Sequence, residues 1–137
     1  MSKHEIVQPA GWPRPRGYAN GVAARGRQVF VAGQIGWDAS EQLVGEDLAS
    51  QFRQALANVR AVVEAAGGSV EDIVRLTIYC TDVPAYREGV AAIGAAYREV
   101  LGKHFPAMAL LGISELVHPG AKVEIEATAM IEEGSDA

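Results

Sequence analysis

Residues 73–101, IVRLTIYCTDVPAYREGVAAIGAAYREVL, contain the change of hydrophobic period that decides the fold class. From Ile73 to Cys80 apolar and polar side chains alternate, which is the period-two pattern of a β-strand with one buried face. From Val83 or Ala85 to Leu101 the apolar residues recur every three or four positions, as on one face of a helix. A strand followed by an amphipathic helix predicts a sheet covered by helices.

The same pattern of strand and helix precedes this segment. Residues 46–66 are predicted to form a first helix, because Leu48, Phe52, Leu56, Val59 and Val63 share one helical face, and two glycines follow it. Before it, residues 18–38 alternate around the sequence ARGR at positions 24–27. This stretch is predicted to be a β-hairpin with its turn at those four residues.

Two further strands are predicted after the second helix. Residues 107–113 are almost continuously apolar, which is typical of a strand buried on both faces. Residues 122–130 alternate, so that Val123 and Ile125 face one way while Glu124 and Glu126 face the other. Cys80 falls on the apolar face of its own strand, which favours a buried structural thiol.

The predicted fold is therefore α+β, with the order β-β-α-β-α-β-β in one domain of residues 1–137. Residues 1–17 are expected to form an extended arm because of three prolines, and residues 132–137 a frayed tail. Two helices cover only one face of such a sheet. The other face would carry Phe30, Gln34, Tyr79, Glu124 and Met108 or its neighbours, so we expect it to mediate oligomerisation.

Composition excludes several classes of protein. Twelve Lys and Arg residues against seventeen Asp and Glu give a net charge of −5, which argues against binding to nucleic acid or to anionic lipid. No signal peptide or membrane-spanning run is found, and the single cysteine fits a reducing compartment, so a cytoplasmic location is expected. One Cys and three scattered His offer no metal-binding spacing, and no cofactor is implied.

Two features could carry chemistry. Glu124 and Glu126 share one strand face, and neighbouring carboxylates can differ in proton affinity so that one acts as a general acid or base. The alternative is a solvated rim of charge. Tyr18 follows Arg14, Arg16 and Gly17 in a loop, where its phenol could bind a ligand or cover the edge of the sheet.

The sequence resembles the RidA (YjgF, reactive-intermediate deaminase) superfamily from Tyr18 to Met130. The resemblance is carried by a series of short motifs in the family's order and spacing, namely FVAGQIG at 30–36, QALANV at 54–59, AAG at 65–67, IVRLT at 73–77, FPA at 105–107 and VEIEA at 123–127. It implies a chorismate-mutase-like fold and a homotrimer in which the sheets line an inner barrel. Three small-ligand clefts would then lie between subunits.

The resemblance also implies a chemistry, from which this chain departs at three positions. The best-known members hydrolyse short-lived 2-imino acids or enamines to 2-oxo acids and ammonia, and an arginine after the Pro-Ala step holds the substrate carboxylate. That position is Met108 here, while Ala32 and Leu110 replace two other polar residues of the family pattern. Because a thioether cannot pair with a carboxylate, we expect a divergent subgroup with little 2-iminobutanoate activity.

Other family positions are retained. Tyr18, the Gly33 backbone and Glu124 match the family's loop tyrosine, its glycine and the glutamate thought to orient the attacking water. Glu124 and Tyr18 are therefore the catalytic candidates. The candidates for substrate binding are Met108, Ala107, Ala109, Leu110, Ala32, Gly33 and Arg16. We expect a cleft walled by Met108, Leu110 and Ala32 to prefer a less charged or more apolar ligand, although Arg14 or Arg16 could resupply the missing cation.

Three functions remain open from the sequence. The first is a hydrolase acting on a small reactive imine or enamine with non-standard specificity. The second is a non-catalytic trimer that binds or senses a small ligand in the same clefts. The third is a holdase or ribonuclease role, both claimed for relatives, and the net charge of −5 disfavours the ribonuclease. Glu124→Gln should abolish activity in the first case and change only affinity in the second.

Overall fold

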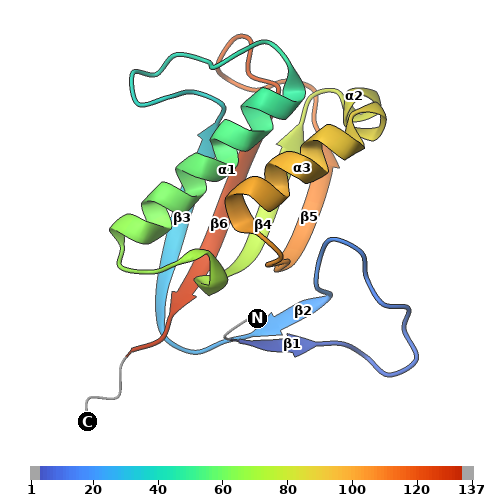
Figure 1. The fold of residues 1–137 in the computed structure, drawn as a ribbon, viewed down its shortest axis with the longest axis vertical. Helices are drawn as coiled ribbons and strands as arrows, with labels where there is room; N and C mark the ends of the chain where they lie inside the picture. Colours follow the sequence, from blue (N-terminus) through green and yellow to red (C-terminus); the bar gives the residue numbers. More distant parts are fainter. Residues whose placement is uncertain (1–3, 134–137) are drawn as a thin grey trace.

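A four-stranded mixed sheet forms the centre of the structure, a computed structural model that describes residues 4–133 (Figure 1). Its strand order is β3–β6–β4–β5. The central strand β6 runs antiparallel to both neighbours, whereas β4 and β5 are parallel. The strands span Arg27–Ile35 (β3), Ile73–Cys80 (β4), Ala107–Gly112 (β5) and Val123–Ile131 (β6).

The helices cover one face of this sheet (Figure 1). They are α1 (Leu48–Ala65), the short 3₁₀ turn η1 (Val70–Asp72), α2 (Val83–Glu88) and α3 (Val90–Leu101). Asp47 caps α1, because its carboxylate accepts a hydrogen bond from the amide of Ser50. The predicted first helix is confirmed to within two residues at each end.

The predicted second helix is wrong in one respect, because it is two helices. The amide of Gly89 donates to the carbonyl of Ala85 and ends α2, while its carbonyl accepts from the amide of Ile93 and begins α3. Asp82 and Pro84 fix the start of α2, where the Asp82 carboxylate accepts from the amide of Ala85. The hydrophobic period continues through the break, so the pattern alone did not reveal it.

The hydrophobic core lies between the helices and the sheet. Along β4 and β6 the residues on the helix side are buried, among them Leu76, Ile78, Val123 and Ile125. Cys80 is buried on this same side, as expected. The predicted alternation is confirmed along β6 and from Leu76 onward in β4, where the intervening residues face away from the helices and are only half-buried. It is wrong at the start of β4, because a register shift between Ile73 and Arg75 buries Ile73 and leaves Val74 half-buried.

The predicted hairpin at residues 24–27 is wrong. The segment before the turn forms β2 (Gly21–Ala23), which pairs with β1 (Glu5–Val7) of the N-terminal arm, and the segment after it is β3, which pairs with β6. The chain passes between the two sheets at Gly26, whose φ of +140° suits glycine. The arm therefore supplies a strand of its own, and the observed order carries one more strand than expected.

The segment after residue 106 was predicted to be buried on both faces, and this is also wrong. β5 is an edge strand, and Ala109, Leu111 and Gly112 are exposed. The opposite edge strand β3 is likewise open, with Phe30 71% exposed. Residues 132 and 133 are exposed, and the rest of the predicted tail lies outside the described residues.

Candidate functional site

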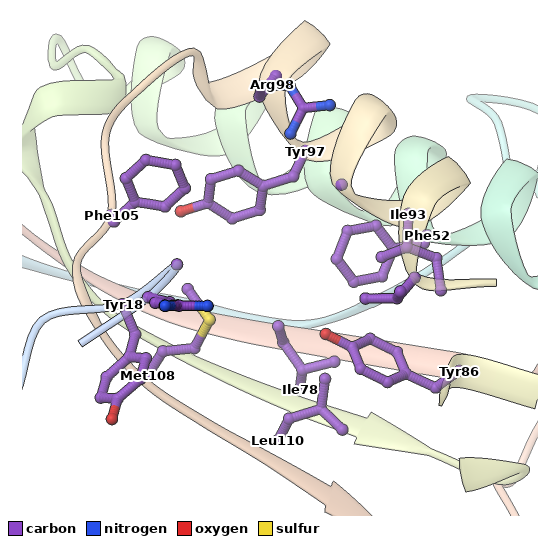
Figure 2. A pocket seen from close by; sticks show the side chains of 14 residues that line it. Tyr18, Phe52, Ile78, Tyr86, Ile93, Tyr97, Arg98, Phe105, Met108 and Leu110 are labelled. Carbon is purple, nitrogen blue, oxygen red and sulfur yellow. The ribbon is translucent and has the colours of Figure 1, made fainter. Parts of the chain in front are cut away.

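A cavity of about 520 Å³ lies where α3 crosses the β4–β5 edge of the sheet (Figure 2). The loop before β2 closes one side of it. The cavity is lined by Arg16, Gly17, Tyr18, Phe52, Ile78, Tyr86, Val90, Ile93, Gly94, Tyr97, Arg98, Phe105, Met108 and Leu110. Its size is in the usual range for small-molecule sites.

Backbone pairing explains how distant parts of the sequence meet here. The register of β5 sets Met108 beside Leu76 and Leu110 beside Ile78, so both side chains point to the helix side. The amide of Ala19 donates to the carbonyl of Pro106 at 3.0 Å, in an isolated bridge next to β5. This bridge brings the loop of residues 16–18 against the start of β5, and therefore against Met108.

The cavity is apolar at depth and open at its rim. Phe52, Ile78 and Ile93 are almost fully buried, whereas Tyr18 is 42% exposed and Val90 is 54% exposed. Figure 2 shows Phe52 and Ile93 together at one end, with Tyr18 and Met108 at the other. An apolar group that enters would displace water from these walls, which favours binding.

The tyrosines of the cavity differ in their roles. Tyr97 is buried, its hydroxyl donates to the carbonyl of His104 at 2.6 Å, and its ring stacks on Phe105 with centroids 5.2 Å apart. Burial raises the pKa of Tyr97 and also that of the half-buried Tyr86. The spacing of apolar residues along residues 83–101 predicts core positions for both tyrosines. Tyr97 is buried as predicted, whereas Tyr86 is only half-buried, and both line the cavity.

Two arginines give the cavity a positive charge. Arg16 comes from the arm and Arg98 from α3, and both are exposed. Within residues 4–133, neither guanidinium forms a hydrogen bond or an ion pair, and no carboxylate lines the cavity. Arg14, the other candidate cation, lines two other clefts along the arm and does not line this cavity.

The glutamates of β6 lie on the opposite face of the sheet. The hydroxyl of Tyr79 donates to Glu126 at 2.5 Å, and this bond raises the pKa of Tyr79. Within the described residues no hydrogen bond or ion pair engages Glu124. A Cβ added at Gly33 would overlap the Glu124 carboxylate, so that carboxylate rests directly on the Gly33 backbone. The two glutamates therefore differ, because Glu126 accepts a side-chain hydrogen bond and Glu124 accepts none within the described residues.

One chain brings together only part of the predicted site. Met108, Leu110, Tyr18 and Arg16 share the cavity on the helix side. Ala107 and Ala109 alternate with Met108 and face away from it, on the open side. Glu124, Gly33 and Ala32 also belong to the open side, and β3 and β5 form opposite edges of the sheet.

The cavity includes residues that the sequence did not single out. Phe52 and Ile93 belong to the apolar helix faces, where periodicity indicates burial but not a neighbouring cavity. Arg98 sits on a helix that is otherwise apolar toward the sheet, and no motif marked it. Among residues 4–133 no cluster of His, Cys, Asp and Glu could hold a metal ion, and no helix there is long and apolar enough to span a membrane.

Residues 13–131 match the family model described as Endoribonuclease L-PSP. The chain belongs to this family, the RidA/YjgF family. It is 38% identical over 116 residues to the 2-iminobutanoate/2-iminopropanoate deaminase of Salmonella typhimurium, covering 82% of this chain and 86% of that protein. It is 33% identical over 126 residues to a RutC family protein of Pyrococcus horikoshii, covering 91% and 96%.

Solved structures of RidA/YjgF proteins share the fold. The Rid family protein YyfB of Yersinia pestis superposes with a TM-score of 0.82 at 34% identity, covering 93% of this chain and 98% of that one. TdcF of Escherichia coli with bound serine gives a TM-score of 0.67 at 31% identity, covering 93% and 99%. The α+β architecture with a mixed sheet is thus that of the RidA/YjgF family.

Proposed function

We propose that this protein is a cytoplasmic imine or enamine deaminase with a substrate preference different from that of the 2-iminobutanoate enzymes. The observation that carries the proposal is the state of Glu124. Its carboxylate rests on the Gly33 backbone, on the face of the sheet opposite the helices, and is free of the bond that occupies Glu126. Relatives named as deaminases align over most of the chain, which supports the same class of chemistry.

The proposed reaction is hydrolysis of a C=N bond. Glu124 accepts a proton from a water molecule as the water oxygen bonds to the imine carbon, and this proton passes to the imine nitrogen, which gives a carbinolamine. Transfer of the hydroxyl proton of the carbinolamine to the nitrogen then lets ammonia leave with the C–N bonding electrons as the C=O bond forms, and a carbonyl compound remains. In this scheme the phenol of Tyr18 hydrogen-bonds the substrate, while Gly33 and backbone groups of Ala107 and Ala109 orient it.

We propose that the complete site forms between copies of the chain in a homotrimer. Within one copy Glu124 lies on the face of the sheet opposite the Met108 cavity, so a neighbouring copy is needed to bring the carboxylate to it. The test is complementation. Tyr18→Phe and Glu124→Gln subunits, each of low activity alone, should regain activity when co-refolded as mixed trimers, whereas a site within one chain would show no gain.

In this proposal Met108 determines which imines the protein accepts as substrates. Imines with and without a free carboxylate can be generated in situ and offered to wild type, Glu124→Gln and Met108→Arg. We expect 2-iminobutanoate and 2-iminopropanoate to be poor substrates, and Met108→Arg to improve their turnover. Glu126→Gln is the matched control, because its amide oxygen can still accept the Tyr79 hydrogen bond. Robust wild-type turnover of either small imino acid would refute the altered specificity.

The second candidate function is a non-catalytic trimer that binds or senses a small ligand. It is favoured by one observation, that the cavity walls carry no carboxylate or imidazole among the described residues. This function would be supported if no imine is hydrolysed and if small molecules still bind, with Glu124→Gln changing only their affinity. The matched family model is described as an endoribonuclease, but we propose no nucleic-acid partner because the net charge is −5.

A further inference from the structure

We propose that Arg16 anchors the carboxylate of ligands that carry an aromatic or branched apolar tail. In the context of the deaminase, the substrate class would be 2-imino acids derived from apolar amino acids. The assignment of a substrate rests on the proposed function, whereas the binding site itself does not.

The first argument is the position of Arg16. The Ala19–Pro106 bridge fixes the loop that carries Arg16 and Tyr18 against β5, so Arg16 lines the same cavity as Met108. Gly17, with φ of +78°, allows the sharp turn between the two side chains. The arm therefore supplies a cation to this cavity, although β5 contributes only the thioether of Met108 at the family's arginine position.

The second argument is the charge around Arg16. Its guanidinium has no acidic partner among residues 4–133, in a chain whose net charge is −5. Arg98, on α3, adds a second cation that has no acidic partner among the described residues (Figure 2). Two unneutralised guanidinium groups around one cavity favour an anion, and the planar group suits a carboxylate.

The third argument is the shape of the cavity. Positive charge lies at the exposed rim, while the deep walls are formed by Phe52, Ile78 and Ile93. A ligand with its carboxylate at the rim and its apolar tail inside satisfies both regions. A two- or three-carbon carboxylate would leave the deep walls uncovered and forgo the gain from burial. The reaction that supplies such a substrate would be the oxidation of an apolar α-amino acid to its imine.

Binding of stable probes tests the site without any turnover. Calorimetry would compare 3-phenylpropanoate with its neutral counterpart 3-phenylpropanamide and with propanoate, which lacks the ring. Wild type should bind 3-phenylpropanoate about tenfold or more tightly than either of the other two. Equal affinity for the acid and the amide, or no binding of the acid, would overturn the proposal.

Variants of the arm locate the anchor. Arg16→Ala should lower the affinity for 3-phenylpropanoate about tenfold and leave that for 3-phenylpropanamide unchanged. Arg14→Ala is the matched control, because Arg14 belongs to the same arm but does not line the cavity, and it should bind like wild type. An equal loss in both variants, or a loss in Arg98→Ala alone, would show that Arg16 is not the anchor.

Activity measured in parallel separates this inference from the proposed function. If the probes bind as expected but no imine is hydrolysed, the deaminase proposal fails and the carboxylate site stands. If imines are hydrolysed in a Glu124-dependent way but the charge of the ligand has no effect, the carboxylate site fails and the deaminase stands.

Discussion

Replacing Gln51 by leucine should destabilise the protein strongly, because this side chain connects three parts of the backbone. Gln51 lies on α1 and is fully buried. Its amide nitrogen donates to the carbonyls of Gly45 at 2.9 Å and Gly120 at 3.1 Å. Its amide oxygen accepts from the amide of Lys122 at 2.8 Å. The loop before α1 and the loop before β6 are therefore held to the same helix.

The magnitude follows from the three backbone groups that lose their partner. A buried polar group left without a hydrogen bond costs about 1–3 kcal/mol. Gly120 and Lys122 occupy exposed positions, so water can reach their groups and the lower value applies to each. Leucine keeps most of the volume, so little cavity cost is added. The free energy of unfolding should fall by about 3 kcal/mol, a large part of the roughly 5–15 kcal/mol of a typical domain.

Urea denaturation followed by circular dichroism measures this loss, at one fixed protein concentration because oligomerisation would make stability depend on it. Gln54→Leu is the matched control. Gln54 is one turn further along α1, is half-buried, and donates only to the side chain of Asn58. We expect the control to lose about 1 kcal/mol or less. A loss in Gln51→Leu no larger than in the control would refute the argument.

Three other predictions concern glycines and a tyrosine. Gly36→Ala would set a Cβ 2.5 Å from the Cα of Gln51, so α1 must move. Thermal unfolding should show that the free energy of unfolding falls by about 3 kcal/mol. Gly33→Ala should displace the Glu124 carboxylate and lower imine turnover about 100-fold while an unchanged melting temperature shows that the fold is kept; undiminished turnover would contradict the role of Glu124. Because burial raises the pKa of Tyr97 above its ordinary value of 10.0, the native state keeps a proton that the unfolded chain loses. The contribution of Tyr97 to the free energy of unfolding is then fully present below about pH 10 and is lost as the pH rises further. Denaturation midpoints measured at about pH 9 and about pH 11 should therefore differ less in Tyr97→Phe than in wild type.

The sequence predicted the elements whose pattern is set by one buried face. The strand of residues 73–80 and the first helix were located closely, because in each the apolar side chains meet the same core. The break at Gly89 and the pairing of β1 with β2 were not predicted. Both depend on backbone hydrogen bonds, at Gly89 within one turn and between β1 and β2 across the arm, and these leave the hydrophobic period unchanged.

The candidate site was predictable only in part. Tyr18, Met108 and Glu124 were identified through the family resemblance, and Arg16 through its place in the arm beside Tyr18. That Glu126 is bonded by Tyr79 while Glu124 is not depends on which side chain crosses from β4, and spacing along one strand carries no such information. Arg98 and Phe52 meet the cavity through packing of α1 and α3, which the sequence does not specify.

The hydrogen bond from the Ala19 amide to the Pro106 carbonyl holds the loop in place, while the side chains of the loop shape the cavity. The bridge uses only backbone atoms, so it persists whatever side chains the loop carries. Residues 14–18 of the arm are mostly exposed and contribute nothing to the core. Substitutions in this short loop, except at Gly17 with its positive φ, can therefore change the charge and shape of the cavity at almost no cost in folding. New ligand preferences can evolve in the arm while the sheet that carries Glu124 stays unaltered.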